Sequence, residues 1–198
     1  MSKILIVAEV KNSEIKKNTL ELISFAKSKG LEMDAVLCGS GVSGQADVLA
    51  GQGASTVYLG DDSSLEIYNT EQYTSLVTDA LQQSGATQVW LSSSELGRDL
   101  TPRVAARQGA GALSDVTQFE VNGDEITAQR PCMSTKVIQK CQFSKDGLRV
   151  ISIRSGFFAP EETSPVPAKT VSLSIPEGHK QLKVKEVQAE VSDEVELN

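Results

Sequence analysis

Residues 88–108 read QVWLSSSELGRDLTPRVAARQ, and they carry the clearest strand-to-helix transition in the chain. Residues 88–91 form a short apolar run, which is typical of a strand covered on both faces. Residues 100–108 have helical spacing, with Pro102 in the first turn of the expected helix, where proline is tolerated. The polar loop between them follows the carboxyl end of the strand, where open α/β sheets bind their ligands.

Strands and helices alternate through the whole first half of the chain. Residues 4–8 form a continuous apolar run that ends at Glu9. Apolar residues at helical spacing then fill residues 15–26, and Gly30 follows as a stop signal. Further strands are expected at residues 35–38 and 56–59, and further helices at residues 46–50 and 73–81. Strands that alternate with helices imply βαβ units and a parallel sheet.

The second half has the pattern of antiparallel hairpins. Residues 115–121 and 125–129 flank Asn122-Gly123, the strongest short hairpin signal. A second hairpin is expected from residues 136–143 and 148–153, around a turn at 145–147. Prolines interrupt residues 159–177, and residues 182–191 alternate apolar with charged side chains as one more strand.

These patterns together define the fold class and the domain organisation. We expect an α/β fold, in which a mostly parallel sheet of the nucleotide-binding kind is flanked by helices and extended by antiparallel hairpins. Residues 1–191 are expected to form a single α/β scaffold domain. Residues 192–198 show no periodicity and are expected to be a linker or tail.

Composition excludes several classes of function. The 198 residues carry 19 Lys+Arg against 26 Asp+Glu, a formal charge of −7, without the basic cluster that nucleic-acid binding needs. Three widely spaced cysteines and one His (His179) cannot complete a metal site. The apolar run at residues 4–8 is too short for a signal peptide or a membrane span, which predicts a cytoplasmic protein without membrane insertion.

A glycine-rich loop at residues 39–44, GSGVSG, matches the G-x-G-x-x-G pattern that lets a pyrophosphate approach backbone N–H groups. Asp61 and Asp62 lie where a ribose-binding carboxylate would follow. However, the loop follows the second strand, whereas this fingerprint belongs to the first strand of a dinucleotide-binding unit. The weak candidates for cofactor binding are therefore Gly39, Gly41 and Gly44, and a plain strand-to-helix turn is the alternative.

The polar loop 92–99 has two interpretations. Its serine hydroxyls and free N–H groups, assisted by Arg98, fit an anion; alternatively, Asp99 or Thr101 simply caps the next helix. A serine-based catalytic triad is excluded because the single His lies in the polar tail and no G-x-S-x-G elbow is present. No catalytic residue is assigned.

Five arginines form a notable set in this acidic chain: Arg98, Arg103, Arg107, Arg130 and Arg154. Arg103 and Arg107 are spaced i, i+4 on one expected helix, so two cations lie side by side unless an anion faces them. A carboxylate or phosphate of a partner is one explanation, and ion pairing within the chain is the other.

The loop and helix also carry a family resemblance. Residues 92–107, followed by Ser114-Asp115-Val116, resemble the N-terminal domain of the alpha subunit of electron transfer flavoprotein. That family has a serine pair after a strand, a Gly-[Arg/Lys]-[Asp/Asn]-Leu-x-Pro-Arg run and then Ser-Asp-[Val/Ile]. Residues 130–136, RPCMSTK, depart from it, because the family usually has Arg-Pro-x-Tyr-Ala-Gly-Lys there. The positions that match the motif are Ser93, Gly97, Arg98, Asp99, Pro102, Arg103, Ser114 and Asp115.

The resemblance implies electron transfer in which this chain does no chemistry itself. In the complete family protein, FAD lies between a second domain of the alpha subunit and a beta subunit that carries AMP. This chain stops where that flavin domain would follow, so no cofactor-binding residue is expected in it. The implied heterodimer carries electrons from acyl-CoA-type dehydrogenases of fatty acid beta-oxidation to a membrane quinone oxidoreductase.

Two hypotheses of function follow. The first is a non-enzymatic scaffold and subunit-assembly domain, whose interface with the beta subunit or the flavin domain includes Arg98, Arg103 and Arg107. The alternative is a stand-alone adenine-nucleotide-binding module that uses the loop at residues 39–44. The encoded length beyond Asn198 would discriminate between them.

Overall fold

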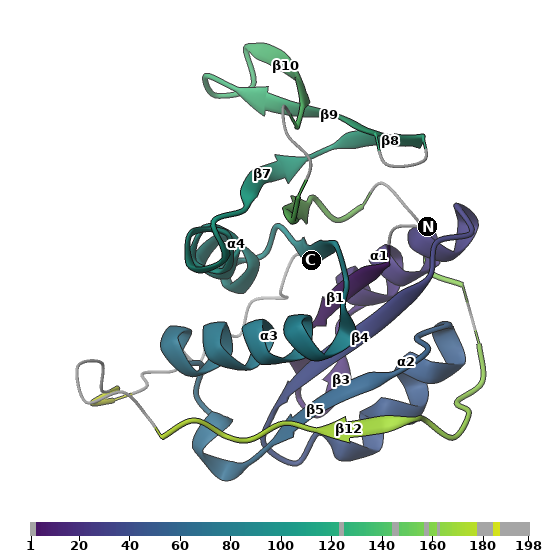
Figure 1. Cartoon of the computed structure of the whole chain (residues 1–198), viewed down its shortest axis with the longest axis vertical. Helices are drawn as coiled ribbons and strands as arrows, with labels where there is room; N and C mark the ends of the chain where they lie inside the picture. Colours follow the sequence, from purple (N-terminus) through teal and green to yellow (C-terminus); the bar gives the residue numbers. More distant parts are fainter. Residues whose placement is uncertain are drawn as a thin grey trace, which may run out of the picture.

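A seven-stranded sheet forms the centre of the molecule, and every pair of neighbouring strands in it is parallel (Figure 1). The structure is a computed structural model that describes residues 3–122, 125–143, 147–156, 159–161, 163–177 and 184–186. The strand order is β12-β5-β4-β1-β6-β11-β7. The strands are β1 (Ile4–Ala8), β4 (Met33–Gly39), β5 (Val57–Asp61), β6 (Gln88–Ser92), β7 (Gly111–Val116), β11 (Arg149–Ile153) and β12 (Thr170–Ser172).

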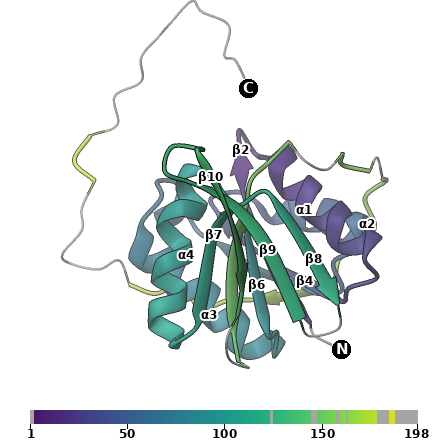
Figure 2. The ribbon, with the colours of Figure 1, turned by 90° about the horizontal axis from the view of Figure 1, so that it is seen from above.

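Helices cover both faces of this sheet, as the expected βαβ units require (Figure 2). Side chains of α1 and α2 join one core cluster, and side chains of α3 and α4 join the other. All five residues of β1 are buried, which confirms the strand expected to be covered on both faces. The helices are α1 (Lys17–Ser28), α2 (Ala46–Gln52), α3 (Thr70–Ser84) and α4 (Glu95–Gln108), with short 3-10 turns η1 (Ser43–Gln45) and η2 (Ser63–Leu65).

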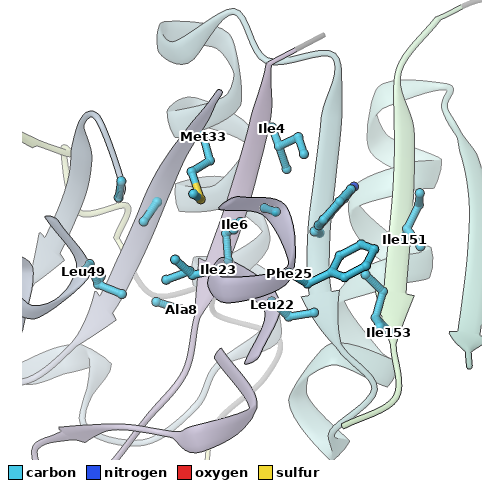
Figure 3. Packing of buried hydrophobic residues seen from close by; sticks show 14 of the residues in the cluster. Ile4, Ile6, Ala8, Leu22, Ile23, Phe25, Met33, Leu49, Ile151 and Ile153 are labelled. Carbon is cyan, nitrogen blue, oxygen red and sulfur yellow. The ribbon is translucent and has the colours of Figure 1, made fainter. Parts of the chain in front are cut away.

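The core on the α1 face is built around aromatic and branched side chains. Phe25 of α1 lies among Ile6 of β1 and Ile151 and Ile153 of β11 (Figure 3). Its ring centroid is 4.7 Å from that of Phe119. The residues of this cluster are removed from water, and burial of such apolar surface is the main stabilising contribution to a fold of this kind.

The antiparallel extension is present and packs onto the same core. It consists of β8 (Gln118–Asn122), β9 (Glu125–Cys132) and β10 (Val137–Gln142). Phe119 of β8 and Ile126 of β9 are buried in the α1-face cluster. The expected hairpin around Asn122-Gly123 is confirmed by the pairing of Asn122 with Glu125. A two-stranded hairpin of β2 (Val10–Lys11) and β3 (Glu14–Ile15) precedes α1. Ile15 was expected to be helical, but it lies in β3.

The second expected hairpin is wrong, because its two strands belong to different sheets. β10 pairs with β9, whereas β11 enters the parallel sheet between β6 and β7. Val150, Ile151 and Ile153 are all buried, which is the signature of a strand covered on both faces. The strand expected at residues 115–121 is also two strands, since β7 ends at Val116 and β8 begins at Gln118.

The last part of the chain adds an edge strand in a segment where the prolines gave no strand pattern in the sequence. β12 pairs with β5 inside the segment 159–177, and Leu173 beside it is buried. Of the strand expected at residues 182–191, only residues 184–186 are described, and they are exposed and outside any strand. His179 and the expected tail at residues 192–198 lie outside the described residues. Among the helices that the structure describes, none is long and apolar enough to cross a membrane.

Candidate functional site

The loop after β6 is shorter than the sequence suggested, because α4 begins at Glu95 rather than near Leu100. Ser94 is the N-cap, and its Oγ accepts a hydrogen bond from the Gly97 N–H at 3.1 Å. This corrects the interpretation in which Asp99 or Thr101 caps the helix. Pro102 therefore lies inside the helix rather than in its first turn; it is exposed. Proline at this position lacks the backbone N–H that would otherwise donate within the helix.

Ser94 also lies near the point where open sheets usually bind ligands. β4 lies on one side of β1 and β6 on the other, so the strand order reverses beside β1. Glu9, which directly follows β1, is 2% exposed, and its Oε1 accepts a hydrogen bond from Ser94 Oγ at 2.6 Å. Its Oε2 pairs with Lys16 Nζ at 3.1 Å. These side chains thus satisfy one another's hydrogen bonds between the ends of β1 and β6.

Position 97 requires glycine because the backbone of β6 lies very close to it. A Cβ built at this position would lie 1.7 Å from the carbonyl oxygen of Ser92, at the end of β6. The first turn of α4 can approach the strand this closely only because residue 97 has no side chain. The motif glycine thus has a packing role in this structure.

Asp99 and Arg103 form an ion pair along α4. Arg103 Nε donates to Asp99 Oδ1 at 2.9 Å, and the Tyr68 hydroxyl donates to Asp99 Oδ2 at 2.7 Å. Burial raises the pKa of Asp99, but hydrogen bonds that include those from Tyr68 and Arg103 outweigh it, so the pKa lies below its usual value. Arg107 Nη1 donates to Ser75 Oγ of α3 at 3.1 Å. These two arginines therefore have partners within the chain.

Ser114 and Asp115 lie at the edge of the sheet, in a second cluster. The Asp115 N–H donates to Ser152 Oγ at 3.1 Å, and Ser93 Oγ donates to the same oxygen at 3.1 Å. Arg154 donates to both carboxylate oxygens of Asp115, with Nε at 3.0 Å from Oδ1. Hydrogen bonding from Arg154 lowers the pKa of Asp115, and the charges of Arg98 and Arg130 lower it further.

The structure thus divides the residues that the sequence indicated. One group lies around Asp115 and consists of Ser93, Arg98, Ser114, Asp115, Arg130 and Arg154. The other group faces α3 and the segment before it, and consists of Asp99, Arg103 and Arg107. Sequence reasoning missed Glu9, Tyr68 and Ser152. Only Glu9 carried a signal, since it is the polar residue that ends the first apolar run.

The glycine loop has its amides occupied by Asp61. The Gly41 N–H donates to Asp61 Oδ1 at 2.6 Å, and the Ser43 N–H donates to Asp61 Oδ2 at 2.9 Å. Desolvation raises the pKa of Asp61, but these backbone hydrogen bonds outweigh it, so the pKa lies below its usual value. The carboxylate expected to bind a ribose instead takes the place that a phosphate would have in the loop.

The described residues do not fit a flavin or a metal ion. Aromatic side chains that could stack on a flavin ring are used in packing: Trp90 is fully buried, and Tyr68 and Tyr73 pack edge to face with ring centroids 4.9 Å apart. In the part of the chain that the structure describes, no group of three or more His, Cys, Asp or Glu could hold a metal ion. The side chains of the candidate site offer hydrogen bonds and charge.

Comparisons with known proteins agree with the motif. A family model described as "Electron transfer flavoprotein domain" matches residues 4–191. "Protein FixB" of Clostridium saccharobutylicum is 30% identical over 177 residues, which cover 86% of this chain and 52% of that protein. The "Electron transfer flavoprotein subunit alpha" of Bacillus subtilis (strain 168) is 26% identical over 199 residues, 99% of this chain and 61% of that protein.

A third relative is also covered over only part of its length. The "Electron transfer flavoprotein subunit alpha" of Megasphaera elsdenii is 29% identical over 168 residues, which cover 82% of this chain and 50% of that protein. The chain thus spans about half to three fifths of the length of these relatives. With the serine, glycine and arginine motif now located at the carboxyl edge of a parallel sheet, the matches show that this chain belongs to the electron transfer flavoprotein family, among relatives that are alpha subunits.

Proposed function

We propose that this chain is the scaffold and subunit-assembly part of an electron transfer flavoprotein alpha subunit. It is not an enzyme: it holds partners in place, while FAD, bound elsewhere in the complete protein, supplies the redox chemistry. The partner is a beta subunit that carries AMP. The complete heterodimer accepts electrons from acyl-CoA-type dehydrogenases and delivers them to a membrane quinone oxidoreductase, and it works in the cytoplasm. Family membership and the motif around Gly97 support this assignment.

Exposed apolar side chains on one hairpin carry the assembly part of the proposal. Met133 is 77% exposed, Ile138 59% and Val137 47%, and all three belong to β10 or to the turn before it. This hairpin projects from the end of the molecule beyond β7 (Figure 1). Val137 and Ile138 are consecutive in β10 and so lie on opposite faces of the hairpin, which leaves apolar side chains exposed on both faces for contact with another protein.

The hydrogen bonds at the carboxyl edge support a scaffold rather than a cofactor-binding role. Ser94 and Lys16 both contact the buried Glu9 carboxylate there, and Asp61 occupies the amides of the glycine loop. An incoming phosphate would have to displace a carboxylate from each of these hydrogen-bonded arrangements. This cost disfavours the adenine-nucleotide module.

Co-purification with the beta subunit tests the assembly proposal. The double variant Met133→Ser and Ile138→Ser is expected to reduce association by at least about tenfold, because two apolar anchors are lost. Ile67→Ser is the matched control, since Ile67 is 46% exposed but lies before α3. Unchanged association of the double variant, with an intact circular dichroism spectrum, would refute the role of the hairpin.

Charge reversal tests the arginine interface separately. Arg98→Glu and Arg103→Glu are both expected to weaken association if the two arginines face the partner. A loss confined to Arg98→Glu would show that Arg103 serves only its ion pair with Asp99.

A spectrum and a titration test the assignment of the cofactors. The isolated chain is expected to melt cooperatively, to be colourless, and to bind NAD, ATP or AMP no more tightly than about 10 μM. A stoichiometric flavin band would show that the cofactor has been misplaced. Tighter nucleotide binding that is lost in Gly41→Val would favour the nucleotide module instead.

A further inference from the structure

Three arginines from distant segments converge on one aspartate at the edge of the sheet. Arg98 lies in α4, Arg130 in β9 and Arg154 directly after β11, and the charge of each acts on Asp115. The Arg154 guanidinium pairs with both oxygens of the Asp115 carboxylate. That pair neutralises one cation, so three arginines and one aspartate leave two formal positive charges, in a chain whose total is −7.

Arg98 and Arg130 are the two cations that remain. Within the described part of the chain, the Arg130 side chain makes one hydrogen bond, from Nη1 to Ser114 Oγ at 3.3 Å, and its buried Nε has no acceptor there. Arg98 is exposed, and among the described residues none forms a hydrogen bond or an ion pair with its guanidinium. Because a buried guanidinium donor without an acceptor is costly, an oxyanion placed against Arg130 would gain charge-assisted hydrogen bonds.

A groove of about 390 Å³ opens beside these groups. It is lined by Asp115, Arg130, Arg154 and the turn at residues 131–135. Two walls of this groove have left-handed backbone: Asp115 has a φ of 61°, and Met133, Ser134 and Thr135 have φ values of 50°, 52° and 67°. Such conformations are uncommon outside glycine and gather where a structure positions functional groups.

We propose that this groove binds the oxyanion of a small molecule, either a carboxylate or a phosphate, at the Arg130 guanidinium, beside the Arg154–Asp115 pair. The planar guanidinium fork matches both kinds of oxyanion, and the groove volume is that of a small-ligand site. Asp115 limits the affinity, because its carboxylate already uses two donors of Arg154 and repels a second anion. Met133 lines this groove and is also an anchor of the proposed partner contact, so binding is tested in the isolated chain.

Nuclear magnetic resonance of the arginine Nε–H groups in the purified chain tests the site, with pyrophosphate and citrate as separate probes. Saturable shifts of the Arg130 and Arg154 signals are expected for at least one probe, and which probe binds distinguishes phosphate from carboxylate. Arg130→Gln is expected to weaken binding by at least about fivefold. Arg103→Gln is the matched control and is expected to bind as the unaltered chain does, because Arg103 is paired with Asp99.

A second variant is expected to raise the affinity for the probe rather than lower it. Asp115→Asn keeps the shape of the side chain but removes the competing charge, so it is expected to bind the same probe about fivefold more tightly. A variant that merely failed to fold would not gain affinity. The proposal is overturned if neither probe gives saturable shifts, if Arg130→Gln binds normally, or if Asp115→Asn binds more weakly.

Discussion

Replacing Gly97 with alanine is expected to destabilise the fold through one backbone contact. The new Cβ would lie 1.7 Å from the Ser92 carbonyl oxygen, far below an ordinary van der Waals contact, and neither atom belongs to a flexible side chain. Separating α4 from β6 enough to relieve this clash costs about 3 kcal/mol, the upper end for overpacked cores, because the contact is so short. Alanine recovers about 1 kcal/mol of helix propensity, so the net loss is about 2 kcal/mol.

Urea unfolding followed through Trp90 measures this loss. Trp90 is the single tryptophan and is fully buried, so its fluorescence reports on the core beside β6. With a urea dependence of about 2 kcal/mol per molar, the unfolding midpoint should fall by about 1 M. Gly44→Ala is the matched control: a Cβ there meets nothing within 4 Å, so the variant should be unchanged or more stable by about 0.5 kcal/mol. Equal midpoints for Gly97→Ala and the unaltered chain would refute the steric argument.

Three further substitutions test other parts of the structure. Asp61→Asn should lower the melting temperature at neutral pH, and the difference from the unaltered chain should shrink as the pH falls below about 4. The pKa of Asp61 is lower in the folded chain than in the unfolded chain, so its carboxylate stabilises the fold above the unfolded pKa, and this contribution is lost as the pH falls through the folded pKa. A difference in melting temperature that does not change with pH would contradict this. Thr135→Gly should raise stability by about 1 kcal/mol in urea unfolding, since a β-branched residue at a φ of 67° is strained; a loss would show that the threonine side chain matters more. Ser94→Ala should cost about 2 kcal/mol in the same assay, because the helix cap and the partner of the buried Glu9 are removed together; a loss below about 0.5 kcal/mol would argue against that cap.

Much of the parallel sheet could be predicted from the sequence, and its edges could not. The strand at residues 4–8 and the helix around Leu76 could be predicted from the spacing of their apolar residues alone. By contrast, the apolar run of β11 suits either a hairpin or a buried parallel strand, and only its neighbours β6 and β7 decide which. β12 was hidden because its three residues lie among prolines.

The candidate site was predicted in its motif but not in its arrangement. The sequence indicated Ser114, Asp115 and the arginines separately. The structure joins Asp115 to Ser152 of β11 and to Arg154 directly after it, more than thirty residues along the chain. Spacing along one helix suggested that Arg103 and Arg107 repel each other. Their actual partners, Asp99 and Ser75, relieve that repulsion through contacts that depend on the packing of α4 against α3.

The place of β11 has a consequence for the order in which the chain folds. β7 is made before β11 but has no neighbour in the parallel sheet other than β11, so it stays unpaired until residues 149–153 have arrived. Residues 117–148, including the three antiparallel strands, are synthesised in this interval. The half of the sheet from β5 to β6 consists of strands already present by residue 92 and can pair earlier. The edge that carries Asp115 is therefore the slow, non-local part of folding, where contacts far apart in sequence must close together.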